Sequence, residues 1–201
     1  FRRGMDLYFE RCDGTAATIE QFLACFAESS GKDLGHFARW YEQAGTPAIT
    51  ASGHYDAAAR RYTLDLTQST PPTPGQAEKQ PLVLLIRLGL VGAQGDLPLK
   101  TGSNAYAGDG LVVLDDSSLS ITFEEVAEAP IPSLMRGFSA PARLELDLPQ
   151  AALLRLFSTD SDSFNRWQAL QTVATRALVE AGKPGSNPLA LTETAGALGT
   201  A

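Results

Sequence analysis

A proline-rich segment between two strand-like segments is the feature that most constrains the fold of this chain. Over residues 61–67, apolar side chains alternate with polar ones, which is typical of a strand with one buried face. Residues 68–81, the proline arm, contain prolines that lack the N–H a β-ladder needs. Alternation resumes over 82–90, and its first half is apolar on both sides. We therefore predict a surface arm without sheet hydrogen bonds, followed by a central strand buried on both faces.

The rest of 46–148 also has the two-residue period of β-structure. About seven short strands with no helix between them indicate a β-sandwich of immunoglobulin-like kind. The cysteine pair and tryptophan of antibody domains are absent from this segment, so only the architecture is predicted. Strands are expected near 49–52, 61–67, 82–90, 97–99, 111–114, 119–123 and 142–148, with a loop over 102–110.

Residues 1–45 instead have helical periodicity and are expected to form three short helices. Thr18 and Gln21 have the spacing of a capping box at the start of the second helix, and Gly31 is expected to end it. Asp33 is expected to cap the third helix. The aromatic side chains of that helix are predicted to be core residues: Phe37, Trp40 and Tyr41.

Helical periodicity returns after Pro149. A short helix is expected over 150–157, then a longer one capped by Asp162 and ended by Gly182, and a further helix in the tail containing Leu189, Leu191 and Leu198. The predicted fold class is therefore α+β, with several domains. It comprises a helical segment at 1–45, a β-sandwich at 46–148 and the start of a helical domain at 149–201.

Composition and charge exclude several classes of partner. A net charge of −7 without clustered Lys or Arg argues against nucleic acid and against an anionic membrane surface. No apolar run reaches the roughly 20 residues that span a bilayer. Two cysteines without a CxxC pair favour a reducing compartment, so we predict a cytoplasmic protein. The chain opens inside an amphipathic helix, from which we expect it to be a segment of a longer protein.

Motifs for catalysis are weak in this sequence. His36 and His54 each lack a histidine partner at i+4, so no zinc-peptidase HExxH helix is present. Gly137-Phe138-Ser139 lacks the second glycine of a nucleophile elbow. Gly108-Asp109-Gly110 is shorter than a phosphate-binding GxGxxG motif and is predicted to be a hairpin turn.

Two acidic pairs and two cysteines could in principle bind metal or react. Asp115-Asp116 and Glu124-Glu125 lack EF-hand spacing, so a turn and a solvated strand face explain them better. Cys25 lies on an apolar helix stripe and is expected to be buried, and Cys12 has no partner motif. We therefore predict no catalytic, metal-binding or substrate-binding residue in this chain.

Five segments in fixed order resemble a known family: LYFERCDGTAAT (7–18), FARWYEQAGTP (37–47), QSTPPTPGQAEKQP (68–81), PSLMRGFSAP (132–141) and FNRW (164–167). Together they resemble the bacterial type of aminopeptidase N, a zinc-dependent M1 metallopeptidase that removes N-terminal residues from peptides. The likeness covers about 1–180, and the proline arm is its most specific part.

The resemblance implies a role for each part of the chain. Residues 1–45 would end the catalytic domain, 46–148 would be the small β-sandwich domain, and 149–201 would begin the C-terminal helical domain. The zinc ligands and the residues that grip the substrate amine would lie before residue 1. This chain alone would then be inactive and would bind no zinc, while contacting the remaining domains of the parent enzyme.

Two functional hypotheses follow. The chain is a non-catalytic segment of a zinc aminopeptidase, in which the sandwich links the catalytic and C-terminal domains, or it is a free-standing β-sandwich binding module without enzymatic activity. Because alternating strands should leave polar outer faces, we also expect the sandwich to offer little apolar surface to the helices. The terminal helices would then cause self-association.

Overall fold

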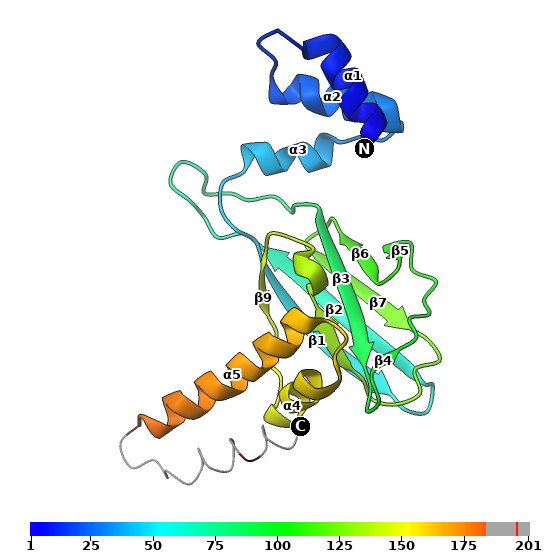
Figure 1. The fold of residues 1–201 in the computed structure, drawn as a ribbon, viewed down its shortest axis with the longest axis vertical. Helices are drawn as coiled ribbons and strands as arrows, with labels where there is room; N and C mark the ends of the chain where they lie inside the picture. Colours follow the sequence, from blue (N-terminus) through cyan, green and yellow to red (C-terminus); the bar gives the residue numbers. More distant parts are fainter. Residues whose placement is uncertain (184–195, 197–201) are drawn as a thin grey trace.

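The chain runs from a helical end, through a β-sandwich, to a second helical end (Figure 1). The computed structural model describes residues 1–183 and Gly196, and the predicted tail helix lies outside this range. The helices are α1 (Arg2–Cys12), α2 (Ile19–Ser30), α3 (Gly35–Glu42), α4 (Gln150–Thr159) and α5 (Ser163–Ala181). The predicted fold class is confirmed.

The strands form two sheets. One has the order β7-β2-β1-β9, and the other has the order β4-β3-β6-β5 with β8 also paired to β3. The strands are β1 (Ala48–Asp56), β2 (Arg61–Ser69), β3 (Leu84–Val91), β4 (Asp96–Leu97), β5 (Tyr106–Gly108), β6 (Leu111–Leu114), β7 (Ser118–Phe123), β8 (Ile131–Leu134) and β9 (Arg143–Glu145).

The main core lies between these two sheets. Alternate side chains of β1, β2, β3, β6 and β7 point inward, as the two-residue period predicts. Leu64, Ile86 and Phe123 are among those that have no exposed surface. Fully burying one such side chain stabilises the fold by about 1.5–3 kcal/mol.

The structure has two strands that the sequence did not predict. β5 lies inside the expected loop 102–110, and it is too short to show a period. β8 contains Pro132, a residue that argues against a strand. Proline is tolerated there because β8 pairs with β3 alone among the described strands, so one side of β8 needs no ladder hydrogen bonds. The last strand, expected over 142–148, is only β9.

The prediction for β3 is wrong in one respect. Its first half is not buried on both faces, because the Leu85 side chain is 42% exposed. The second half, from Leu88 to Val91, is buried on both faces. There the outer face is covered by the segment after β8 and by the C-terminal helices.

The proline arm also begins later than predicted. Gln68 and Ser69 belong to β2 and pair with Ile49 and Ala48 of β1. From residue 70 to 83 the arm has no strand, apart from one isolated bridge between Thr73 and Gln76. The expectation of a segment outside both sheets therefore holds only for this shorter stretch.

Helix ends follow their capping residues in most cases. The Thr18 side chain accepts from the Gln21 N–H while the Gln21 side chain accepts from the Thr18 N–H, which confirms the capping box. Gly31 ends α2 in a left-handed conformation. Asp162 caps α5 by accepting a hydrogen bond from the Asn165 N–H at 2.9 Å.

The prediction for α3 needs two corrections. Asp33 is not its cap: the Asp33 carboxylate accepts from the Gly35 N–H in a local turn, and the helix starts after it. Phe37 and Tyr41 are 38% and 49% exposed, and their rings contact each other edge to face. Only Trp40 packs against the main core.

α1 and α2 form an antiparallel pair beyond α3, at the end of the molecule farthest from α5 (Figure 1). Their contact is aromatic: the ring centroids of Tyr8 on α1 and Phe22 on α2 lie 5.1 Å apart, and Phe22 in turn lies 4.7 Å from Phe26 on the same helix. A carboxylate–guanidinium pair, Glu28 with Arg11, adds two hydrogen bonds at the surface.

The C-terminal helices pack directly on the sandwich. Val91 of β3 and Ile131 of β8 form a second apolar cluster with side chains of α4 and α5: Leu153, Leu156, Ala169 and Val173. The expectation that the sandwich offers little apolar surface is therefore wrong at this end. The reason is that outward-facing positions near the end of β3 are apolar, contrary to strict alternation.

Candidate functional site

Neither histidine belongs to a group of metal-binding side chains among the described residues. His36, on α3, places its Nε2 atom 2.9 Å from the Pro81 carbonyl oxygen at the end of the proline arm. His54 is an exposed residue of β1. Within the described residues, no three side chains of the His, Cys, Asp and Glu types gather as metal ligands would. The described residues therefore do not fit a zinc ion.

The two glycine-containing motifs have structural contacts. The Ser139 hydroxyl accepts a hydrogen bond from the Arg87 N–H at 2.8 Å, which joins the segment after β8 to β3. Asp109 and Gly110 form the turn between β5 and β6, so this motif lies in a hairpin turn as predicted. In that turn the Asp109 carboxylate forms an ion pair with Arg87 at 2.8 Å.

The acidic pairs are separated from each other. Asp116 lies in the turn between β6 and β7, where its side chain accepts from the Ser117 N–H. Glu124 and Glu125 pair with Arg61 and Lys100 respectively at the surface. These contacts agree with a turn and a solvated face.

The cysteines are both buried and are not joined in a disulfide. Cys25 is 2% exposed, which confirms its expected place on the apolar stripe of α2.

The arrangement with most polar contacts on the N-terminal side is the arm joint, which we define as α3 with the proline arm. Arg39 donates to the Pro81 carbonyl at 2.9 Å, and the Trp40 Nε1–H donates to the Val83 carbonyl at 2.9 Å. Gln43 both donates to and accepts from the backbone of Gln80. The arm is thus held by side chains of the preceding helix through its backbone groups.

Gln68 fixes the place where the arm returns to the sandwich. Its buried side-chain amide accepts from the Leu82 N–H at 2.9 Å and donates to the Leu82 carbonyl at 2.8 Å. It also donates to the Asp116 carbonyl at 2.8 Å. The side chain therefore supplies the hydrogen bonds that a neighbouring strand would supply just before β3 begins.

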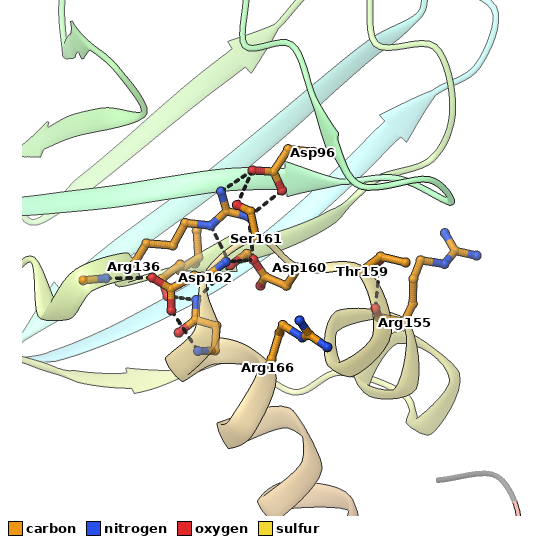
Figure 2. Close-up of polar contacts among 12 residues, drawn as sticks. Asp96, Arg136, Arg155, Thr159, Asp160, Ser161, Asp162 and Arg166 are labelled. Atoms are coloured by element: carbon orange, nitrogen blue, oxygen red, sulfur yellow. Dashed lines mark hydrogen bonds and ion pairs between the residues drawn. The ribbon is translucent and has the colours of Figure 1, made fainter. Parts of the chain in front are cut away.

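On the C-terminal side, the corresponding arrangement is the Arg136 cluster, which comprises Asp96, Ser133, Arg136, Asp160 and Ser161 (Figure 2). Arg136 donates two hydrogen bonds to Asp96, at 2.7 and 2.8 Å, and one to Asp160 at 2.7 Å. Its Nε donates to the Ser133 hydroxyl at 2.9 Å. The cluster thereby joins β4, β8, the 3-10 turn Arg136–Phe138 and the segment between α4 and α5.

Burial makes these contacts strong. The side chains of Arg136 and Asp160 are 11% and 0% exposed. Gly89 of β3 makes room for the guanidinium, because a Cβ atom there would lie 2.1 Å from it. The hydrogen bonds from Arg136 lower the pKa of the Asp96 carboxyl. Burial alone would lower the pKa of Arg136, but its bonds to Asp96 and the charge of Asp160 outweigh this and raise it.

Neighbouring polar groups extend the cluster along α5. Asn165 donates to the Ser133 hydroxyl at 2.8 Å and to the Leu134 carbonyl at 2.9 Å. The Gly137 N–H donates to the Asp162 carboxylate at 3.1 Å. The first turn of α5 is therefore fixed to the sandwich at several points. These groups position the C-terminal helices.

Sequence reasoning missed both the Arg136 cluster and the role of Gln68. The partners lie 24 and 40 residues from Arg136, so spacing could not connect them. One available signal was the cap residue Asp162, which lies next to the cluster. Another was the motif at 132–141, which contains Arg136. Among the described residues, no helix combines the length and apolar character needed to cross a membrane.

Comparison with protein families gives two matches along the chain. A family described as a domain of unknown function (DUF3458) with an Ig-like fold matches residues 45–147. A second family, described as a domain of unknown function (DUF3458_C) with ARM repeats, matches residues 150–199.

Curated relatives and a solved structure agree in type. Aminopeptidase N of Caulobacter vibrioides is 45% identical over 174 residues, covering 87% of this chain and 19% of the relative. Aminopeptidase N of Escherichia coli is 38% identical, covering 86% of this chain and 20% of the relative. The crystal structure of Legionella pneumophila aminopeptidase A in complex with aspartic acid aligns with a TM-score of 0.75 at 25% identity, covering 98% of this chain and 22% of that one. The chain spans about a fifth of the length of the curated relatives it matches. The resemblance to aminopeptidase N is confirmed.

Proposed function

The chain belongs to the DUF3458 family of Ig-like domains, and from this premise we propose that it is a non-catalytic part of a zinc-dependent aminopeptidase. Nearly nine-tenths of it aligns with aminopeptidases N, which is the observation that carries the proposal. In the whole enzyme, the sandwich would link the catalytic domain and the C-terminal helical domain. Residues 1–45, 46–148 and 149–201 would belong to the three parts in that order.

The geometry of the two joints supports a linking role. The arm joint attaches the helices before the sandwich, and the Arg136 cluster attaches the helices after it. A sandwich bonded to helices on both sides can hold two larger bodies at a fixed distance. That is a positioning function, and it requires no reactive group within the sandwich.

Zinc would then be held elsewhere in the parent enzyme, together with the groups that bind peptide substrates. His36 is engaged with the Pro81 carbonyl, and among the described residues neither histidine belongs to a group of three side chains that could hold a metal ion. No step of peptide hydrolysis is therefore assigned to this chain. We also propose a cytoplasmic location for the parent enzyme, from the cysteine usage of this chain.

Metal content and turnover test the proposal. The 201-residue chain, dialysed after expression, should contain no stoichiometric zinc and should not hydrolyse alanine anilides. The parent enzyme, by contrast, should bind zinc and should hydrolyse alanine anilides. One zinc per chain, or turnover above the buffer blank by the 201-residue chain, would contradict the proposal. An inactive longer polypeptide without zinc would favour the free-standing binding module.

A further inference from the structure

One groove in the structure is separate from both joints. It has a volume of about 560 Å³ and lies between the outer edge of β1, the segment 129–132, the segment 146–149 and α4. This volume is within the range of ligand-binding sites in proteins. Three features of its walls point to the same kind of ligand.

The first feature is an unpaired strand edge. β1 pairs with β2 along all nine of its residues, without a bulge. On the other side, β9 pairs only with Ala48–Thr50. The outer edge of 52–56 therefore has no strand partner among the described residues, and this stretch contains no proline or lysine of the kind that usually protects an edge.

The second feature is a buried tyrosine with a free hydroxyl. Tyr62 is 3% exposed and its side chain crosses β1 at Gly53, where a Cβ atom would lie 1.8 Å from the hydroxyl oxygen. Tyr62 and Gly53 both line the groove. The hydroxyl has no hydrogen-bond partner in the described part of the chain, and its oxygen is open to the groove rather than enclosed by protein. Burial raises the pKa of Tyr62 to about 12, so the hydroxyl is a neutral donor at physiological pH.

The third feature is an unpaired cation. Arg155, on α4, lines the same groove and is half-buried. In Figure 2 its guanidinium points away from the Arg136 cluster, and no dashed line reaches it. Its carbonyl accepts hydrogen bonds from Ser158 and Thr159, but within residues 1–183 the guanidinium has no ion pair or hydrogen bond. The carboxylate of Asp147, in the facing wall, is already paired with Arg176.

We propose that this groove binds an extended peptide segment that carries a carboxylate, and that the peptide adds a strand to the outer edge of β1. An extended backbone is the ligand that can pair with a row of alternating N–H and C=O groups. The Arg155 guanidinium matches the carboxylate, and the Tyr62 hydroxyl donates to a peptide carbonyl. The proposal does not depend on the aminopeptidase assignment.

Peptide binding to the full 201-residue chain tests the proposal. The probe is a labelled, C-terminally amidated hexapeptide of alternating threonine and valine that ends in glutamate, followed by fluorescence anisotropy. We expect saturable binding below roughly 1 mM. A matched peptide with glutamine in place of the glutamate should bind about tenfold or more weakly, because it lacks the charged partner.

Backbone pairing is tested with N-methylated peptides. Methyl groups on every second amide block one edge of an extended peptide. Two peptides are therefore compared, one methylated on the odd-numbered amides and the other on the even-numbered amides. One of the two methylated peptides should lose binding, and the other should retain it. Equal binding by the two methylated peptides would show that the peptide does not pair as a strand.

Protein variants assign the side chains. Arg155→Gln should weaken the glutamate peptide by about 10- to 100-fold and leave the glutamine peptide unchanged. Tyr62→Phe keeps the buried ring and should weaken both peptides by about 2- to 10-fold. Arg3→Gln, on the distant helix α1, is the matched control and should change neither affinity. Thermal unfolding of each variant verifies that it remains folded.

Four outcomes would overturn the proposal. They are the absence of saturable binding, binding that Arg155→Gln does not weaken, equal affinity for free succinate, and a dimer by light scattering that excess peptide does not dissociate. The third outcome would indicate a site for small carboxylates. The fourth would indicate that a second copy of the chain occupies the groove.

Discussion

The helices on the two sides of the sandwich are attached by different kinds of contact. α3 is attached mainly by side chains that donate to backbone carbonyls of the proline arm, and Trp40 is its main apolar contact with the core. α4 and α5 share an apolar cluster with β3 and β8 and are also joined by the buried Arg136 cluster. Both attachments use hydrogen bonds, but only the second also contains an aspartate whose side chain is fully buried against a guanidinium, Asp160 with Arg136.

This difference bears on stability. Exposed hydrogen bonds exchange readily with water and contribute about 0.5–1.5 kcal/mol each. Buried apolar side chains contribute about 1.5–3 kcal/mol each, and a buried ion pair that loses one partner is strongly destabilised. We infer that the sandwich and the C-terminal helices unfold as one unit. The helices α1–α3 form a separate and less tightly attached unit.

Deleting each helical end should give the largest contrast between the two attachments. Removing 149–201 exposes Val91 and Ile131 and leaves Arg136 without Asp160, so we expect a loss of about 3–6 kcal/mol in the free energy of unfolding. Removing 1–45 uncovers mainly the site of Trp40, and we expect a loss of less than about 2 kcal/mol. Urea unfolding followed by circular dichroism measures both. A sandwich of 46–148 that is as stable as 46–201 would contradict the inference.

Breaking the Arg136 cluster should have the next largest effect. Arg136→Leu leaves Asp160 as an unpaired charge with a fully buried side chain, so we expect a loss of about 3–5 kcal/mol in urea unfolding. The matched control is Arg176→Leu, because Arg176 also pairs with an aspartate but is 47% exposed. The control should lose about 1 kcal/mol or less. Similar losses in the two variants would show that the cluster does not hold α4 and α5.

The sandwich could be predicted from the sequence because its signal is local. Alternation in 61–67 and 119–123 identifies β2 and β7, and the capping box at Thr18 identifies the start of α2. β8 was missed because its proline suggests a segment that is not a strand. β8 pairs only with β3 among the described strands, and a strand at this position tolerates a proline. For β2, β7 and the start of α2, the interactions that determine the structure lie within a few residues. For β8, the structure depends on the neighbouring strand.

The sites could not be predicted because their residues are brought together by the tertiary fold. Arg136 meets Asp96 across β3, through space that Gly89 leaves open. Tyr62 reaches the outer edge of β1 only because residue 53 is also glycine. A single sequence does not reveal which glycine faces which side chain. The prediction that the outer face of the sandwich is polar was wrong at the end of β3, where α4 and α5 cover apolar side chains.

Acid should weaken the C-terminal attachment more than the arm joint. Arg136 holds the pKa of Asp96 below its ordinary value, so the unfolded state binds the proton more readily than the folded state. The resulting stabilisation is present above about pH 4 and is lost as the pH falls through the lower folded-state pKa. Because Asp96 is partly exposed, we expect only about 1 kcal/mol.

The comparison of native protein with Asp96→Asn measures this effect. The two should differ in the free energy of unfolding at pH 6 and converge as the pH falls below about 4. Asp147→Asn is the control, because Asp147 is 95% exposed in its pair with Arg176. A difference that persists unchanged at low pH would show that the charge of Asp96 is not what stabilises the cluster.

The smallest expected effect comes from the arm joint itself. Trp40→Phe keeps an aromatic ring against the core and removes only the hydrogen bond to the Val83 carbonyl, which is 2.9 Å long. Water can reach the half-buried Val83, so we expect a loss of about 0.5 kcal/mol, at the low end for a hydrogen bond. Amide hydrogen exchange should accelerate over residues 70–81 and remain slow in β3. Trp167→Phe is the control, because Trp167 is 53% exposed and has no hydrogen bond in the described structure. If Trp40→Phe instead accelerated exchange throughout β3, the arm and α3 would belong to the same cooperative unit as the sandwich, and the contrast between the two attachments would fail.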